Sequence, residues 1–431
     1  MTVEIIVLIG ALFFLAGIGV PIAYAILLAS MAYVLADGSS IGIIGKRFLD
    51  GVYDSFLLLA VPLFIVAANI MNAGTISDKL LNFCIATVGR FKGGLGHVNV
   101  MASLIFSGMS GSAVADAAGI GKIIIDMMRK DNRFPAGYAA AITAASATIG
   151  PIIPPSIPMV LYALVSNASI GALFLGGILP GLMMGGVLMA MNAWLAHRRN
   201  FGVEAPVPVR QLPAVTVRAF PALLMPAILL YGIYGGVTTP TEAAAVAAAY
   251  ALILSVVFYR ALKLKKLYEI LVESARSSAA VGIVIGGALI LNYIVASENI
   301  PSMIASGLVD LNVDPLVFLL MVNVLILLLG CLLDATTIIL VIVPLFIPTC
   351  RELGIDLVHF GVVIVVNCMI GLITPPYGIL LFVINAVTRI SLAEIVQEIW
   401  VFLAVLVAAL LAMIFFPEIV LFLPKQFGYQ P

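Results

Sequence analysis

The sequence predicts an all-α polytopic membrane protein that contains two inverted-topology repeats. Of its 431 residues, 63% are hydrophobic and only 10% are charged, whereas a soluble domain carries roughly 25% charged residues. The mean hydropathy of +1.22 is enough for on the order of ten membrane spans of about 20 residues each. Two long stretches, 134–196 and 357–388, contain no Asp, Glu, Lys or Arg, and each is interrupted by a Pro-Pro pair. These observations exclude a water-soluble globule.

Composition also excludes several functions. The 21 basic and 21 acidic side chains cancel, so no net charge attracts nucleic acid. The four cysteines lie apart in apolar sequence, without the paired spacing of a metal site. Residues 118–122 are a poor phosphate loop, because Asp116 stands where the first glycine belongs and Ile123 where Ser or Thr must reach Mg²⁺. We therefore expect no nucleotide, no nucleic acid, no organic cofactor and no enzymatic activity.

Charged residues divide the chain into apolar segments that are long enough to form helices. We predict helices at 3–20, 21–36, 50–73, 171–197, 214–235, 240–260, 272–297 and 396–416. Residues 40–49 carry Lys46 and Arg47 and are expected to lie at the membrane interface. Two amphipathic pieces, Ser77–Lys92 and Leu262–Val272, are predicted to be interfacial arms.

An internal duplication is the most informative feature of the sequence. Residues 149–156 (IGPIIPPS) match residues 370–377 (IGLITPPY) at a constant offset of 221 positions. Each break follows an apolar segment that contains small residues and one acid, Asp116 in the first half and Asp334 in the second, 218 positions apart. Two features in the same order at nearly the same offset indicate a repeat.

The duplication predicts two re-entrant helical hairpins and two discontinuous helices. The first repeat, 1–200, holds a hairpin at 95–130 and a broken helix at 134–168. The second repeat, 214–424, holds a hairpin at 314–351 and a broken helix at 356–388. A cytoplasmic linker at 201–213 and a C-terminal tail at 425–431 complete the predicted organisation.

Basic residues predict the orientation of the two halves. His197 to Arg199, with Arg210 and Arg218, and the run from Arg260 to Lys266 form two basic loops, which the positive-inside rule places in the cytoplasm. Counted from these loops, the first broken helix runs outward and the second runs inward. Inverted repeats of this kind are typical of secondary transporters.

The breaks are candidate cation sites. Proline lacks an N–H and clashes with the carbonyl four residues earlier, so each break leaves carbonyl oxygens without helical partners. Facing a hairpin tip, such oxygens are suitable ligands for dehydrated Na⁺, with Ser or Thr hydroxyls completing the shell. The candidates are Gly150, Ile153 and Ser156 facing 107–112, and Gly371, Thr374 and Tyr377 facing 330–336. The alternative is a pair of proline kinks packed on neighbouring helices.

The acids near the breaks have three interpretations. A carboxylate inside the membrane costs at least about 2.5 kcal/mol and requires a partner. Asp116 and Asp334 could cap the second arm of each hairpin, support a bound cation, or take part in catalysis or proton relay. Glu242 follows Thr239 and Pro240, and is expected to belong to a capped helix start with Thr239 or Thr241 as the cap.

Three stretches resemble a known family, the large membrane subunit (DctM-like) of the tripartite ATP-independent periplasmic (TRAP) transporters. They are residues 108–121 (GMSGSAVADAAGIG), 138–156 (YAAAITAASATIGPIIPPS) and 238–245 (TTPTEAAA). The second-half sequence TPPYG at 374–378 also fits. The resemblance covers essentially the whole chain, and its middle stretch is highly specific.

The resemblance implies Na⁺-driven uptake of an organic acid, such as sialic acid or a C4-dicarboxylate, across the bacterial inner membrane. It also implies two partners, a small four-helix membrane subunit and a periplasmic binding protein that delivers the acid. The implied fold is an ion-transporter-like elevator, in which 95–169 and 314–388 move as one body past a scaffold of the remaining helices.

The resemblance implies three groups of site residues: those of two Na⁺ sites, those that contact the substrate between the hairpin tips, and those that support the sites. The first Na⁺ site would comprise Ser107, Gly108, Gly150, Ile153 and Ser156, and the second Gly330, Gly371, Thr374 and Tyr377. The substrate would contact Ser110, Gly111, Ser112, Pro154, Pro155, Asp334, Thr336, Pro375 and Pro376. Structural or electrostatic support would come from Asp116 and Glu242.

Two other functions remain alternatives. One is a self-sufficient Na⁺/dicarboxylate symporter of related fold. The other is an intramembrane hydrolase that uses Asp116 and Asp334, although neither lies in a Gly-x-Gly-Asp sequence.

Overall fold

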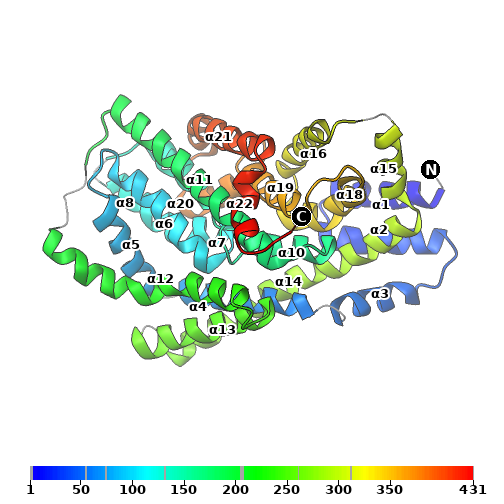
Figure 1. Cartoon of the computed structure of the whole chain (residues 1–431), viewed down its shortest axis with the longest axis horizontal. Helices are drawn as coiled ribbons and strands as arrows, with labels where there is room; N and C mark the ends of the chain where they lie inside the picture. Colours follow the sequence, from blue (N-terminus) through cyan, green and yellow to red (C-terminus); the bar gives the residue numbers. More distant parts are fainter. Residues whose placement is uncertain are drawn as a thin grey trace.

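The structure is a computed structural model that describes residues 3–53, 56–72, 75–130, 133–203, 208–260, 262–310 and 313–430. Within these ranges every regular element is helical, as the sequence predicts. Figure 1 shows an elongated bundle with α1, α2 and α3 at one end and α5, α8 and α12 at the other. Five of the described helices (α11, α12, α13 with η5, α14 and α21) are long and apolar enough to cross a membrane.

Among the described residues, the first half contains eight α-helices before and within its hairpin, and three after it. The elements are α1 (Val3–Gly17), α2 (Ile22–Ala36), α3 (Gly42–Tyr53), η1 (Phe56–Leu59), α4 (Ala60–Asn72), α5 (Thr75–Val88), α6 (Gly94–Ser110), α7 (Ala113–Asp116), the π-helix η2 (Ala117–Gly121), α8 (Lys122–Arg129), α9 (Ala136–Ala147), α10 (Ile157–Ser166) and α11 (Ile170–Arg198). The hairpin therefore consists of α6 and α7–α8, and the broken helix of α9 and α10, as predicted.

The second half repeats this order. Its elements are η4 (Val209–Gln211), α12 (Leu212–Tyr234), α13 (Pro240–Ile253), the π-helix η5 (Leu254–Phe258), α14 (Leu264–Ser297), α15 (Ile300–Asp310), α16 (Pro315–Gly330), α17 (Ala335–Thr337), the π-helix η6 (Ile338–Ile342), η7 (Val343–Leu345), α18 (Ile347–Glu352), α19 (Leu357–Gly371), α20 (Ile379–Thr388), α21 (Leu392–Phe415) and α22 (Glu418–Gln426). The hairpin is α16 with α17–α18, and the broken helix is α19 with α20.

Two hydrogen bonds, one for each hairpin, connect the hairpin with the broken helix of the other half. Arg129, at the end of the first hairpin, donates to the carbonyl of Thr388 at the end of α20, 3.4 Å away. Arg351, at the end of the second hairpin, donates to the carbonyl of Ser166 at the end of α10, 3.2 Å away. The two arginine donors are 222 positions apart in the sequence, and so are the two carbonyl acceptors. Each hairpin is therefore bonded to the broken helix of the other half in the same way.

Three predicted elements differ in the structure. The predicted helix at 50–73 is interrupted by the 3₁₀ turn η1, and α3 already begins at Gly42 inside the predicted interfacial segment. The predicted arm at 262–272 and the helix at 272–297 are one continuous helix, α14, because no Gly or Pro occurs between Leu264 and Val281. Residues 204–207 of the predicted linker and the last residue of the predicted tail lie outside the described residues.

Most of the described helices can be assigned to two groups, which meet where α6 packs on α4, α5 and α12. We call α1–α5 and α12–α14 the frame, because α4 packs on α13, α14 packs on α2, α3 and α4, and α12 packs on α5. We call α6–α11 and α16–α22 the core body, in which α21 packs on α9, and α11 packs on α6, α19 and α22. The sequence places α11 and α21 with the scaffold, whereas the structure packs both against the broken helices.

Candidate functional site

The tip of the first hairpin meets the first break at Gly111. This residue ends α6 with a left-handed backbone (φ +59°), a conformation that glycine adopts without steric cost. A Cβ atom there would lie 2.6 Å from the carbonyl oxygen of Pro155. Ser110 is buried and Ser112 half-buried, so the predicted tip residues lie directly against the buried Pro154–Pro155 pair, whose peptide bond is cis.

Asp116 lies inside this contact but does not cap the hairpin arm. Ser112 is the N-cap of α7, and its hydroxyl accepts from the amide of Ala115 at 3.4 Å. Asp116 is one turn further on and only 3% exposed, and neither of its carboxylate oxygens has a hydrogen-bond partner among the described residues. A Cβ atom on Gly150 would be 2.5 Å from Asp116 Oδ2. The carboxylate therefore points at the broken backbone and remains unpaired.

Ser156 spans the first break. It is fully buried and is the N-cap of α10, where its hydroxyl accepts from the amide of Met159 at 3.2 Å. The same hydroxyl donates to the carbonyl of Pro151. The break is therefore held in a tight turn by a side chain that the sequence singled out.

Three other predicted residues of the first site have different neighbours. The hydroxyl of Ser107 donates to the carbonyl of Leu104, one turn back in α6, at 2.6 Å. Gly108 faces the frame, since a Cβ atom there would lie 2.3 Å from Pro226 Cγ in α12. The side chain of Ile153 packs on Gly181 of α11. Only backbone groups of Gly108 and Ile153 are then available for a site.

In the second half, two predicted glycines bring tip and break together. Gly330 ends α16 and Gly371 ends α19, and a Cβ atom on Gly371 would be 2.7 Å from the Cα of Gly330. The amide of Gly378, after the second break, donates to the carbonyl of Cys331 at the tip, 3.3 Å away. The two elements therefore approach backbone to backbone.

Asp334 does cap the second hairpin arm, unlike Asp116. Its carboxylate accepts from the amide of Thr337 at 3.1 Å and from the hydroxyl of Thr337 at 2.6 Å. Thr336, the predicted contact residue, is half-buried beside it. Thr337 was missed by the sequence reasoning, although its position three residues after an N-cap Asp is the usual capping distance.

The second break is more open than the first. The hydroxyl of Thr374 donates to the carbonyl of Ile370 at 2.8 Å, and its amide donates to the carbonyl of Gly371 at 3.0 Å. Pro376 is exposed and Tyr377 is 48% exposed, with its ring 4.8 Å from that of Phe382. Pro375 and Pro376 are joined by a cis peptide bond, like the pair in the first break.

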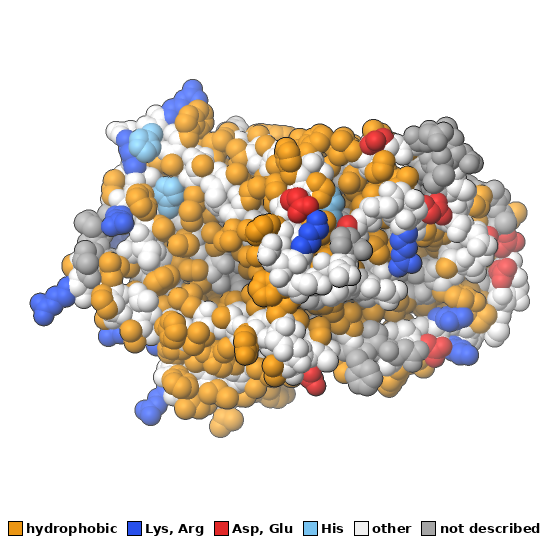
Figure 2. Space-filling view, in the orientation of Figure 1, with side chains coloured by type: hydrophobic (Ala, Val, Ile, Leu, Met, Phe, Trp, Pro, Cys, Tyr) orange, Lys and Arg blue, Asp and Glu red, His pale blue; other side chains and the backbone are white. Residues whose placement is uncertain are grey.

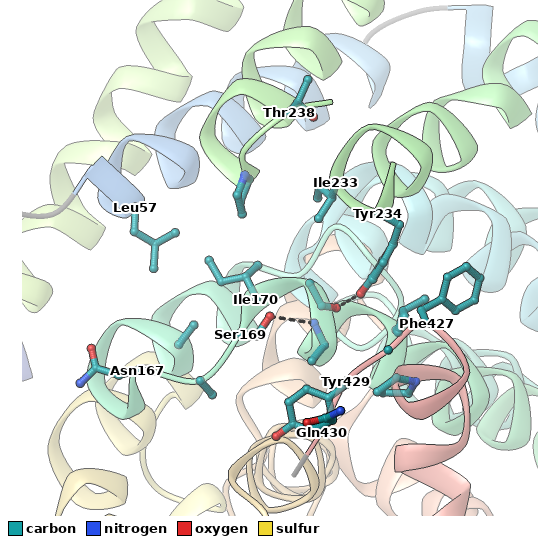
Figure 3. Close-up of a pocket in the computed structure, with 18 residues that line it drawn as sticks. Leu57, Asn167, Ser169, Ile170, Ile233, Tyr234, Thr238, Phe427, Tyr429 and Gln430 are labelled. Carbon is teal, nitrogen blue, oxygen red and sulfur yellow. Dashed lines mark hydrogen bonds between the residues drawn. The ribbon is translucent and has the colours of Figure 1, made fainter. Parts of the chain in front are cut away.

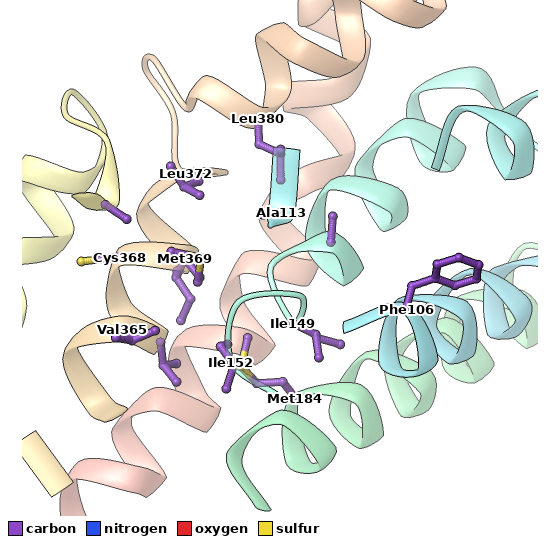
Figure 4. Close-up of a cluster of buried hydrophobic side chains, with 14 of the residues drawn as sticks. Phe106, Ala113, Ile149, Ile152, Met184, Val365, Cys368, Met369, Leu372 and Leu380 are labelled. Carbon is purple, nitrogen blue, oxygen red and sulfur yellow. The ribbon is translucent and has the colours of Figure 1, made fainter. Parts of the chain in front are cut away.

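The two halves of the site adjoin at the centre of the core body. α7, which follows the first tip, contacts α20, which follows the second break, and α17 likewise contacts α10. Figure 4 shows Ala113 beside Leu380, and Ile149 and Ile152 of the first break beneath Met369. Both tips and both breaks therefore belong to one packed centre.

The surroundings of the two hairpins differ. In the second hairpin, α17 and η6 pack on α14 of the frame, and α10 of the first broken helix packs on α4 and η1. In the first hairpin, α6 packs on α4, α5 and α12 of the frame, whereas α8 packs on α9 and α20. Lys122, Ile123 and Asp126 on the outer face of α8 are exposed. The frame therefore contacts both hairpins, and the second arm of the first hairpin has an exposed face.

Glu242 lies in the frame, away from the tips. Thr239 is the N-cap of α13, accepting from the amide of Glu242 at 3.3 Å, while Glu242 accepts from the amide of Thr239 at 2.7 Å. This reciprocal capping box fixes the turn between α12 and α13. Of the two caps that the sequence allows, the structure selects Thr239.

A cavity of about 750 Å³ separates the frame from the core body beside this turn. Figure 3 shows Leu57, Ile233 and Tyr234 of the frame facing Ser169 and Ile170 of the core body across it. The hydroxyl of Tyr234 donates to the carbonyl of Gly171. None of the residues that line this cavity belongs to the predicted site.

Comparison with known proteins decides the family. Residues 9–419 match the family model described as "Tripartite ATP-independent periplasmic transporter, DctM component". The chain belongs to this family. It is a membrane permease subunit of a TRAP transporter, as its sequence motifs and apolar helices predict.

Full-length relatives support the assignment. The chain is 40% identical to the sialic acid TRAP transporter large permease protein SiaM of Vibrio cholerae, over 95% of this chain and 96% of that protein. It is 37% identical to the C4-dicarboxylate TRAP transporter large permease protein DctM of Pseudomonas aeruginosa, over 87% of this chain and 88% of that protein. A solved structure, the YdaH transporter of Alcanivorax borkumensis, has a similar fold (TM-score 0.62) at 17% identity, covering 90% of this chain and 89% of that one.

The contact between Gly330 and Gly371 yields the first prediction. Gly371→Ala would place a methyl group 2.7 Å from backbone, which cannot move as a flexible side chain can, so the hairpin must separate from the break. We expect this variant to lose Na⁺-dependent thermal stabilisation, measured as the rise in melting temperature of the purified chain when Na⁺ replaces choline. Gly119→Ala, at a position with nothing within 4 Å, is the matched control and should behave like the wild type. An unchanged Na⁺ response in Gly371→Ala would mean that this contact does not shape a cation site.

Proposed function

We propose that this TRAP permease subunit couples Na⁺ entry to the uptake of a small organic acid by alternating access. The observation that supports this most strongly is the unpaired, buried Asp116 carboxylate at a break in the helix backbone. A lone carboxylate in an apolar interior is costly without a counter-charge. A cation that enters with the substrate would supply that charge.

The first Na⁺ site would combine Asp116 with oxygen atoms of the break. Gly150 lies against the carboxylate, and the Ser156 hydroxyl and the carbonyls around Ile153 belong to the same turn. Hard oxygen ligands of this kind suit an alkali cation. Asp116 thereby takes the role of cation support, because Ser112 already fills the capping role.

The second Na⁺ site would rest on backbone carbonyls at Gly330, Gly371 and Thr374. The helices α16 and α19 end at Gly330 and Gly371. The Gly371 carbonyl accepts one hydrogen bond, from the amide of Thr374, and its second lone pair could bind a cation. Asp334 lies in the same tip but is neutralised in part by its hydrogen bonds to Thr337. The exposed Tyr377 would close this site from the open side.

The organic acid would bind between the two tips. Ser110, Gly111 and Ser112 on one side and Thr336 with Pro375 and Pro376 on the other border the packed centre. Hydroxyls and backbone amides at the starts of α7 and α17 can donate to a carboxylate. The relatives' names, which cite sialic acid and C4-dicarboxylates, support an acid of this class.

The division into frame and core body supports an elevator mechanism. The start of α6 lies beside the end of α11, where Lys92 donates to Asn200 at 2.8 Å, so the first hairpin enters from the side of the basic loop at His197 to Arg199. This loop is expected in the cytoplasm. Movement of the core body along the frame would then expose the centre alternately to the cytoplasm and to the periplasm.

Two partners complete the proposed system. The family description is tripartite and periplasmic, and the relatives are named large permease proteins. We infer a small membrane subunit beside this chain and a periplasmic binding protein that delivers the acid, with the assembly in the bacterial inner membrane. Uptake by this chain alone in liposomes would instead select a self-sufficient symporter.

The two proposed sites predict cooperative dependence on Na⁺. Uptake of the delivered acid by the complete complex should require Na⁺ and rise with a Hill coefficient above one, because two cations enter per cycle. Uptake is measured in proteoliposomes with Na⁺ varied against choline. Full uptake driven by a proton gradient without Na⁺ would contradict the proposal.

Substitutions at Asp116 and Thr374 separate the roles of charge and hydroxyl. Asp116→Asn removes the counter-charge at nearly constant volume and should weaken the apparent Na⁺ affinity by about tenfold or more, since interactions with a charged group contribute roughly 1.5–3 kcal/mol. Thr374→Val should have a mild effect, because its hydroxyl already bonds within α19 and its carbonyl remains. Na⁺ titration of the melting temperature measures both. Equal affinities in Asp116→Asn and the wild type would remove Asp116 from the site.

A further inference from the structure

A groove runs between α11 and α21 on the outer surface of the core body. Its volume is about 470 Å³, and its walls are apolar side chains of the two helices, among them Met183 and Val187 from α11 and Ala408 and Ala412 from α21. The opposite faces of both helices are buried, with Leu188 and Leu406 fully inaccessible. No described element covers the groove.

The groove follows from side-chain size at regular helical spacing. Val187 and Trp194 lie one and three turns from Met183 and so form one long wall of α11. Ala408 and Ala412 lie one turn apart on α21, and their small side chains leave space between the helices. The result is an apolar groove along two helices that are long and apolar enough to span a membrane.

One end of the groove carries an unpaired positive charge. Trp194 lines that end and is 51% exposed, and the guanidinium carbon of Arg198 lies 5.2 Å from the centroid of its ring. The neighbouring Arg199 is already paired with Glu398 at 2.7 Å, whereas the described residues provide no carboxylate partner for Arg198. In Figure 2 apolar side chains cover the upper edge of the molecule, where α11 and α21 lie, and basic side chains and His gather at the outer end of α11.

We propose that this groove binds an anionic phospholipid, with one acyl chain between α11 and α21 and its phosphate at Arg198. Basic sites between membrane helices on the cytoplasmic side are recognised by anionic headgroups, and tryptophan rings favour the boundary between headgroup and chain. Trp194 lies between the apolar channel and the guanidinium, where that boundary would fall. The site belongs to the core body, so a bound lipid would move with it. This site is separate from the proposed Na⁺ and substrate sites.

The two tryptophans of the chain allow a direct test. Trp194 and Trp400 are the only ones in the sequence, and Trp400 lies on α21 outside the groove lining. Trp400→Phe therefore leaves Trp194 as the single tryptophan of the full chain, whose emission is excited selectively over that of tyrosine. Reconstituted in phosphatidylcholine, this variant is titrated with phosphatidylglycerol or phosphatidylcholine that carries the same brominated acyl chains, which quench on contact.

The proposal predicts a headgroup preference at Trp194. Brominated phosphatidylglycerol should quench Trp194 at about fivefold lower mole fraction than brominated phosphatidylcholine, the ratio expected when one basic residue contributes roughly 1 kcal/mol near an anionic lipid. Arg198→Gln should abolish the preference, whereas Arg198→Lys, which retains the charge, should keep most of it. Arg210→Gln, at another exposed basic residue, is the matched control and should have no effect.

Three results would overturn the proposal. One is equal quenching of Trp194 by the two lipids, and another is a preference that survives in Arg198→Gln. The third is loss of lipid quenching when the small membrane subunit is added, which would assign the groove to a protein contact. In the complementary variant Trp194→Phe, quenching is measured at Trp400 instead, and we expect no headgroup preference. A preference at Trp400 as large as that at Trp194 would indicate a general surface effect and would also contradict the proposal. The assay needs no transport, so its outcome does not depend on the proposed Na⁺ coupling.

Discussion

The fold depends on one constraint, the need to satisfy backbone polar groups where helices are interrupted inside an apolar body. Each Pro-Pro pair stops a helix at a depth where lipid offers no hydrogen bonds. In the structure a hairpin tip packs against each break. Gly111 contacts Pro155 in the first half, and Gly330 contacts Gly371 in the second. Small residues are required at these contacts because only they allow backbone to approach backbone. The duplicated sequence thus produces two such junctions. An arginine at the far end of each hairpin donates to the end of the other half's broken helix.

The two junctions differ in the surroundings of their acids. In the second half, Asp334 is held by the amide and hydroxyl of Thr337 and so behaves as a cap. In the first half, Ser112 takes the cap and leaves Asp116 buried one turn deeper against Gly150. The carboxylate of Asp116 is buried and has no hydrogen-bond partner among the described residues. The carboxylate of Asp334 accepts two hydrogen bonds from Thr337.

Much of the architecture could be predicted from the sequence, since prolines, glycines and the absence of charge are local signals. The two hairpins and two broken helices occur where the repeated motifs place them. The capping residue of the first hairpin could not be predicted, because Ser112 and Asp116 are both good caps and the choice depends on where Gly111 turns the chain. The continuity of α14 was missed because its charged first turns resembled a separate arm, although no Gly or Pro interrupts them. The membership of α11 and α21 in the core body depends on packing between distant segments, which hydropathy does not record.

If both junctions move together in the core body past the frame, a covalent link between the core body and the frame must stop transport. A reversible disulfide tests this most directly. Gly171 in α11 and Ile233 in α12 face each other across the cavity between them, and a Cβ atom on Gly171 would lie 3.5 Å from Ile233 Cγ2. Cysteines at these two positions are introduced after replacement of the four buried native ones, and uptake by the complete complex is measured before and after oxidation. We expect the disulfide to stop uptake and its reduction to restore uptake. A link within the core body, between Gly176→Cys and Val362→Cys, should have no effect; a Cβ atom on Gly176 would lie 3.2 Å from Val362 Cγ2. Undiminished uptake in a fully cross-linked 171–233 sample would show that the two bodies do not slide past each other, and would favour a local gate at the hairpin tips.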